Sequence, residues 1–140
     1  MVGNKYLRLK RGTLNEQTII TTLVTRNGID FINPLATVVM DEKKFTGYLL
    51  NPEHEKGKHK ALVFDKVLGF NLSNYKQLMQ AIKVGIAEYP ITRTEATSYG
   101  IQYGVDIPIR GTAGRAAVVI TGRIEVIDGK LRFITAYVKD

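Results

Sequence analysis

The sequence has 140 residues, the length of one ordinary domain, and 44% of them are hydrophobic, so the chain can bury a core. It has no cysteine, which excludes disulfides, thiolate metal sites and cysteine nucleophiles, and its two histidines make a histidine-rich metal site unexpected. Lys and Arg outnumber Asp and Glu by 20 to 13, a net charge of +7, and a basic surface favours polyanionic partners such as nucleic acids.

Residues 1–44 are expected to form a lead-in segment, and residues 45–140 the main domain. The lead-in holds short, β-prone pieces rich in threonine, which are broken by Asn27-Gly28 and Asn33-Pro34. We expect these pieces to pack against the domain or to pair with an edge of its sheet. No apolar run approaches the roughly 20 residues of a membrane span, and no apolar region of a signal peptide follows the basic start.

Two helices are predicted in the middle of the chain. The first runs from about Lys58 to Leu68, where Gly69 stops it. Ser73 is predicted to cap the second, which Pro90 ends. The apolar residues of this second helix recur at the spacing of one helix face: Tyr75, Leu78, Met79, Ile82 and Ile86.

The last third of the chain has the two-residue period of strands. Three strands are predicted, roughly at 99–110, 115–127 and 131–138, joined by turns at Gly111–Gly114 and at Asp128-Gly129. Turns of these lengths set six cross-strand pairs: Val126 with Leu131, Ile124 with Phe133, Ile120 with Tyr137, Ile109 with Ala116, Ile107 with Val118, and Val105 with Ile120.

This register separates an apolar face, which would pack on the helices, from a polar face that is rich in arginine. The polar face would carry Gln102, Asp106, Arg110, Arg115, Thr121, Arg123, Glu125 and Arg132. Glu125 and Arg132 would form a cross-strand ion pair. The predicted fold class is α+β, with N-terminal helices packed on a C-terminal antiparallel β-meander.

The polar face suggests phosphodiester chemistry. Arginine binds phosphate oxygens in pairs and can stabilise a pentacovalent transition state, and a nearby carboxylate can take the proton of a 2′-hydroxyl. Asp106, Arg110 and Arg115 are therefore candidate catalytic residues, and Arg123 is a candidate RNA-binding residue. The alternative is a solvated sheet face with ordinary ion pairs.

A second candidate site is the segment HEKGKHKA at residues 54–61. Lys56, Lys58 and Lys60 crowd the start of a helix, where a bound phosphate would relieve their repulsion. His59 is a candidate catalytic residue, because histidine can serve as a general acid or base. His54 is a weaker candidate because it can simply cap a turn, and the whole segment can also be an exposed basic turn without a ligand.

The segment YLLNPEHEKGKHKALVFDKVLGF, residues 48–70, resembles the opening motif of a bacterial domain family often found at the C-termini of large secreted proteins. In that family, as here, a glycine-rich strand and a closing strand like FITAYVKD (residues 133–140) follow. The resemblance covers about Phe45 to the end of the chain. Helices followed by a short antiparallel sheet also resemble the barnase/EndoU/colicin/RelE ribonuclease fold, which the toxin domains of CdiA-type contact-dependent growth-inhibition proteins frequently use.

The resemblance implies a toxin that cleaves tRNA, with the anticodon loop as the expected target, by metal-independent transesterification and without a cofactor. It implies a secreted or cell-surface effector that acts in the target-cell cytoplasm, and an immunity protein that binds the toxin as a heterodimer; the free toxin is expected to be a monomer. Carried over residue by residue, its catalytic motif falls on His59, Lys60 and Thr135. The predicted register puts Thr135 on the helix side, so either a β-bulge re-aims it or it is a buried structural residue.

Two alternative functions remain open at this point. A non-catalytic nucleic-acid-binding module would use the same cations, with Lys56, Lys58 and Arg123 as the expected contacts. An adaptor would pair an edge strand with a partner protein. A metal-dependent DNase is disfavoured because the sequence has no dense acidic cluster.

Overall fold

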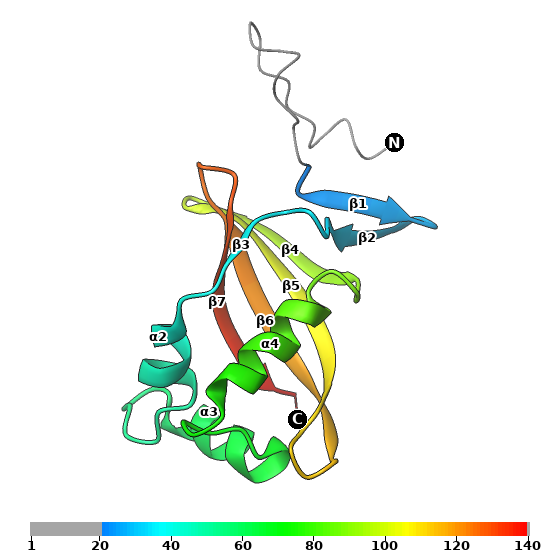
Figure 1. The fold of residues 1–140 in the computed structure, drawn as a ribbon. Coiled ribbons are helices and arrows are strands. Elements are labelled where there is room, and N and C mark those ends of the chain that lie inside the picture. Colours follow the sequence, from blue (N-terminus) through cyan, green and yellow to red (C-terminus); the bar gives the residue numbers. More distant parts are fainter. Residues whose placement is uncertain (1–20, 140) are drawn as a thin grey trace, which may run out of the picture.

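Helices cover one face of a five-stranded sheet in the computed structural model, which describes residues 21–139 (Figure 1). The sheet has the order β3-β7-β6-β5-β4; β3 is parallel to β7 and the other neighbours are antiparallel. Its strands are β3 (Val38–Val39), β4 (Ile91–Thr97), β5 (Gly100–Arg110), β6 (Ala116–Glu125) and β7 (Leu131–Val138). The α+β class predicted from the sequence is confirmed.

The helical part lies between β3 and β4 in the sequence. It consists of α2 (Glu42–Lys44) with the π-helical turn η2 (Phe45–Leu49), α3 (Lys58–Val63) with the π-helical turn η3 (Phe64–Leu68), and α4 (Tyr75–Gly85). Among the described residues, no helix is both long and apolar enough to cross a membrane.

The predicted boundaries of the first helix are confirmed, and the predicted cap of the second is wrong. Gly69 ends the α3–η3 helix in the left-handed conformation at φ 75°, where a residue without a Cβ is favoured. The N-cap of α4 is Asn74, one residue after the predicted Ser73. The Asn74 amide donates to the backbone oxygen of Gly69, so it joins the end of one helix to the start of the next.

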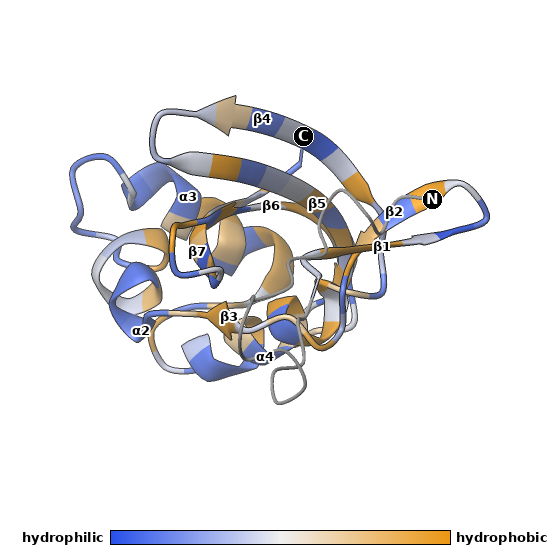
Figure 2. Ribbon diagram, turned by 90° about the horizontal axis from the view of Figure 1, so that it is seen from above, coloured by the Kyte–Doolittle hydropathy of each residue, from blue (hydrophilic) through white to orange (hydrophobic). Residues whose placement is uncertain are grey.

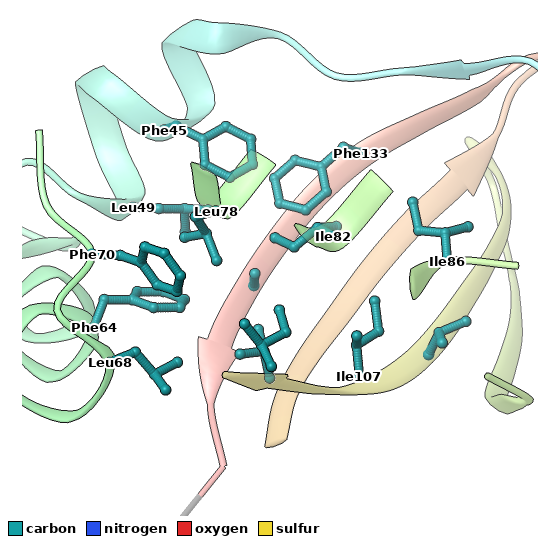
Figure 3. Packing of buried hydrophobic residues seen from close by; sticks show 14 of the residues in the cluster. Phe45, Leu49, Phe64, Leu68, Phe70, Leu78, Ile82, Ile86, Ile107 and Phe133 are labelled. Carbon is teal, nitrogen blue, oxygen red and sulfur yellow. The ribbon is translucent and has the colours of Figure 1, made fainter. Parts of the chain in front are cut away.

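The core lies between the helices and the sheet (Figure 3). Phe45 stacks on Phe133 of β7 with 5.0 Å between ring centroids. Leu78 and Ile82 of α4 are fully buried, as the one-face spacing in the sequence predicts, and Ile107 of β5 is buried with them. Viewed from above, α2 and α4 lie on the same side of the curved sheet (Figure 2). Within residues 21–139, no helix lies on the opposite face of the sheet.

The described part of the lead-in segment packs on the domain and also pairs with its sheet. β1 (Leu23–Arg26) and β2 (Ile29–Ile32) form a hairpin around Asn27-Gly28, and Leu23 and Ile32 are buried in the core. β3 then pairs with the first two residues of β7. Residues 1–20 lie outside the described part, and the boundary between residues 44 and 45 stays a prediction.

Both C-terminal hairpins close through three-residue turns, 112–114 and 127–129, because Gly111 N–H donates to the Arg115 oxygen and Val126 N–H to the Lys130 oxygen. Most of the predicted register is therefore wrong. The first turn pairs Arg110 with Ala116, and the second pairs Glu125 with Leu131; each pairing is one residue away from the prediction. Gly114 at φ 87° and Gly129 at φ 82° occupy the left-handed position that such turns require. The predicted pair Ile120 with Tyr137 is correct, because a β-bulge further along β7 restores the register.

The one-residue slip moves each β6 side chain to the other face of the sheet, which changes the predicted polar face. Thr121 and Arg123 are buried on the helix side instead of lying on the open face. Glu125 accepts a hydrogen bond from Thr22 at 2.7 Å, and the predicted ion pair of Glu125 with Arg132 is replaced by one between Arg132 and Asp128 at 2.9 Å.

Candidate functional site

Thr135 points away from the helices because β7 contains a β-bulge. The β6–β7 register pairs Gly122 with Thr135 but Arg123 with Phe133, so one β7 residue between these pairs has no partner on β6. Phe133 and Ala136 are therefore both buried on the helix side, and Thr135 between them faces the other way. The sequence left two alternatives for Thr135, a β-bulge that re-aims it or a buried structural role, and the structure contains the β-bulge.

Lys60 of α3 reaches Thr135 from the side of β7. Its Nζ donates to the Thr135 hydroxyl at 3.1 Å and to the Tyr48 hydroxyl at 2.9 Å. The same ammonium lies 4.9 Å from the ring centroid of Tyr48 and 5.8 Å from that of Tyr137. Among residues 21–139, no carboxylate forms an ion pair with Lys60. Its charge is held in place by neutral oxygens and rings, and is not neutralised.

The segment between Tyr48 and Lys60 holds these two side chains. His54 Nδ1 accepts hydrogen bonds from the backbone N–H of Lys56 at 3.0 Å and of Gly57 at 2.9 Å, and the His54 ring packs edge-on against Tyr48. Gly57 approaches Tyr48 so closely that a Cβ would lie 2.4 Å from the Tyr48 backbone oxygen. His54 thus caps a turn that orients Tyr48 and starts α3.

A second cation, Arg93 of β4, lies on the same open face. Its guanidinium donates to Asp106 at 3.0 Å, to the Thr92 hydroxyl at 2.9 Å and to the backbone oxygen of Thr121 at 3.2 Å. It lies directly over Gly104, where a Cβ would be 2.2 Å from the Arg93 Nη2 atom. The missing side chain of Gly104 therefore lets Arg93 extend across the sheet.

Two glycines form the floor between the cations. The register aligns one residue from each of four strands across this face: Arg93, Gly104, Gly122 and Thr135. At a strand spacing of roughly 4.8 Å, about 14 Å separates the first backbone from the last. A hollow of about 220 Å³ lies over the floor. The residues that complete its lining are Glu95, Gln102, Tyr103, Ile120, Thr121 and Tyr137.

This arrangement suits a phosphate ester. The Arg93 guanidinium and the Lys60 ammonium present charged N–H donors from opposite sides, and such donors form the strongest hydrogen bonds to phosphate oxygens. The hydroxyls of Tyr48 and Thr135 lie beside Lys60, and the Asp106 carboxylate lies beside Arg93. The face therefore combines anion-binding groups with groups that can transfer a proton.

Residues 32–140 match the family described as a domain of unknown function, DUF6883. The chain belongs to the DUF6883 family. No curated protein matches its sequence. The fold is similar to that of a chain in the solved "Contact-dependent growth inhibition toxin - immunity protein complex from Klebsiella pneumoniae 342", with a TM-score of 0.58 and 22% sequence identity over 73% of this chain and 93% of that chain.

Of the predicted site residues of this DUF6883 domain, Thr135 lines the hollow, and Lys60 and Asp106 each contact a residue that lines it. Lys60 and Thr135 are hydrogen bonded to each other, although 75 positions separate them in the sequence. Asp106 lies on the same face and pairs with Arg93.

The remaining residues of the basic segment lie elsewhere. His59 is exposed and, with Lys58, lines a separate hollow of about 490 Å³ that also includes Asn71. The two hollows share no lining residue. Lys56 is exposed in the turn that His54 caps. The structure therefore divides the predicted basic motif, and Lys60 is the member that reaches the open face.

The predicted arginine cluster is not brought together either. Arg110 follows Asp106 by four residues, or about 14 Å along a strand, and its side chain donates to the backbone oxygen of Gly114 in the turn. Arg115 is exposed just before β6 begins. Both residues lie at the hairpin end, outside the lining of the hollow.

The prediction that Arg123 contacts RNA is wrong, because its side chain is fully buried. Its guanidinium donates to the Tyr103 backbone oxygen at 3.3 Å and to the Thr121 hydroxyl, while Nε has no hydrogen-bond partner. Burial, with a smaller contribution from the charge of Arg93, lowers the pKa of Arg123 to about 10. Arg123 lies beneath the open face and not on it.

Arg93, Tyr48 and Tyr137 complete the site and were missed in the sequence. Arg93 was missed because β4 was not predicted, although ITRTEAT between Pro90 and Gly100 has the β-branched residues that favour a strand. Tyr48 opens the motif that carries Lys60, but its side-chain contact depends on the turn at His54. Tyr137 was assigned to the helix side by the register that ignored the bulge.

Proposed function

We propose that this DUF6883 domain is an antibacterial toxin that cleaves tRNA by metal-independent transesterification. The observation that carries the proposal is the pairing of Lys60, held by Tyr48 and Thr135, with Arg93 and Asp106 across a glycine floor on the open sheet face. Delivery as part of a larger secreted effector and action in the target-cell cytoplasm are part of the same proposal.

In the proposed reaction, the 2′-hydroxyl of a nucleotide attacks its own 3′-phosphate. Asp106 takes the hydroxyl proton, a 2′,3′-cyclic phosphate forms, and the bond to the 5′-oxygen of the next nucleotide breaks. Lys60 gives that leaving oxygen a proton, while Arg93 stabilises the charge on the pentacovalent phosphorus. Asp106 contacts Arg93 at one end of the row across the floor, and Lys60 contacts Thr135 at the other end, while in-line displacement requires the base and the acid on opposite sides of the phosphorus.

The fold and the comparison support the toxin class. Helices followed by an antiparallel sheet with an open polar face fit the barnase/EndoU/colicin/RelE type of nuclease. A chain of similar fold belongs to a toxin–immunity complex, which favours an immunity protein as a partner of this chain too. The net charge of +7 suits a polyanionic substrate.

The test is incubation of the purified protein with total tRNA in EDTA, with wild type, Lys60→Ala and Lys66→Ala compared. We expect discrete fragments that end in cyclic phosphate. We expect Lys60→Ala to lower turnover by roughly 100-fold or more, the usual loss for a proton-transferring group. Lys66→Ala removes an exposed lysine of the same helical segment and should leave turnover unchanged.

Three outcomes would contradict parts of the proposal. Cleavage that EDTA abolishes and Mg²⁺ restores would replace the metal-independent mechanism. Intact tRNA under all conditions, with binding retained, would favour a non-catalytic nucleic-acid-binding module. A loss of turnover in His59→Ala but not in Lys60→Ala would move the acid–base role to the other hollow.

A further inference from the structure

One end of the hollow carries a charge that phosphate binding does not explain. Glu95 of β4 is exposed and lines the hollow, yet no described residue forms a hydrogen bond or ion pair with its side chain. Arg93, two residues away on the same face, is already paired with Asp106. A free carboxylate beside a bound phosphate lowers the affinity for that phosphate, because like charges repel. This position therefore has a use that offsets that cost.

Gln102 lies directly opposite Glu95. The β4–β5 register pairs the two residues, and residues paired in this way have Cβ atoms about 4.5–5.5 Å apart. Gln102 is half-buried in the same lining, and no described residue forms a hydrogen bond with its side chain. The hollow therefore ends in a carboxylate that accepts hydrogen bonds and an amide that both donates and accepts them.

The distance between this pair and Arg93 matches one nucleotide. Glu95 and Gln102 are each two residues from the row of Arg93 and Gly104 along the same strands, or about 7 Å at the usual strand rise. A ribose separates a phosphate from its base in the same way. A phosphate held at Arg93 therefore presents its base to Glu95 and Gln102.

From these contacts we infer that Glu95 and Gln102 form a guanine-recognition site, so that the proposed nuclease cleaves after guanosine. Guanine presents two adjacent N–H donors, N1 and N2, which a carboxylate accepts together, and a neighbouring O6 acceptor that the Gln102 amide reaches. Adenine places a lone pair at N1, and cytosine and uracil lack two adjacent donors, so each of them leaves the carboxylate with an unpaired oxygen.

This inference rests on the proposed function, and its test separates the two. The substrates are four DNA oligonucleotides, each with a single ribonucleotide (A, C, G or U), so that one bond in each can be cleaved. The enzymes are wild type, Glu95→Gln, Gln102→Ala and the control Glu88→Gln, which changes an exposed acid outside the hollow.

We expect wild type and Glu88→Gln to cleave after guanosine at least about tenfold faster than after A, C or U, which is the discrimination that a bidentate contact provides. Glu95→Gln and Gln102→Ala should lose this advantage and keep their rates on the other three substrates. Equal slowing of all four substrates by Glu95→Gln, or an unchanged preference, would overturn the inference. If wild type cleaves none of the four substrates, the proposed function fails. The base preference is then measured as binding to four all-DNA oligonucleotides that differ at the same position, and equal affinity for the four bases would overturn the inference.

Discussion

Lys60 and Arg93 are both cations on the open face, but their environments differ. Arg93 is paired with Asp106 at 3.0 Å, which fixes its position and neutralises part of its charge. Lys60 has two hydroxyl acceptors, so its position is fixed while its full charge stays available to an anion. We therefore expect Lys60 to contribute more than Arg93 to the attraction of a phosphate.

The turn at His54 provides a test of how Lys60 is positioned. His54→Ala removes the acceptor for two backbone N–H groups, so we expect a loss of about 1–3 kcal/mol in the free energy of unfolding and a marked fall in turnover. His54→Asn offers a side-chain oxygen in place of Nδ1 and should recover most of both. Thermal melting and tRNA cleavage are measured for each variant. Recovered stability without recovered turnover would show that His54 transfers a proton itself.

At the scale of elements, the sequence predicted α3–η3, α4 and the three long strands, but not the α2–η2 helix or how the strands face. Periodicity and Gly69 were enough to place the α3–η3 helix, because both are local signals. The register depended on the number of residues in the turns that contain Gly114 and Gly129. One residue more or less moves every side chain of the next strand to the other face of the sheet. The bulge in β7 reflects packing on both faces, so no local pattern predicted that Lys60 and Thr135 would meet.

The reversal of β6 has an energetic consequence at Arg123. Burial lowers the pKa of Arg123 from its usual value to about 10, so at neutral pH the charged form destabilises the folded state by on the order of 3 kcal/mol. This penalty is lost only as the pH rises through about 10. Arg123→Met should therefore raise the free energy of unfolding by about 1–4 kcal/mol.

The measurement for Arg123 is the thermal midpoint at neutral pH. Arg115→Met is the matched control, because Arg115 is exposed and its replacement should leave the midpoint unchanged. A lower midpoint for Arg123→Met would mean that its hydrogen bonds to Tyr103 and Thr121 outweigh the cost of burial.

At the scale of the whole molecule, the described part of the lead-in segment and the helices leave one face of the sheet open. The β1–β2 hairpin contributes Leu23 and Ile32 to the core, and β3 covers the edge of β7 only beside Leu131 and Arg132. No strand among the described residues pairs with the rest of that edge, which includes Thr135, and there Lys60 approaches from α3. The uncovered edge and the open face together form the surface that a substrate or an inhibitor would share.

An immunity protein that inhibits by occupying this surface should be acidic and should compete with tRNA. The protein encoded beside this chain is the expected partner, and complementary charge would speed its association at low salt. In the complex, hydrogen exchange should slow in β4 and in β7 near Thr135, while α4 on the other side of the sheet should be unchanged. The association rate should fall steeply with added salt, since the chain carries a net charge of +7. Protection confined to α4, or an association rate independent of salt, would mean that inhibition works from a different surface.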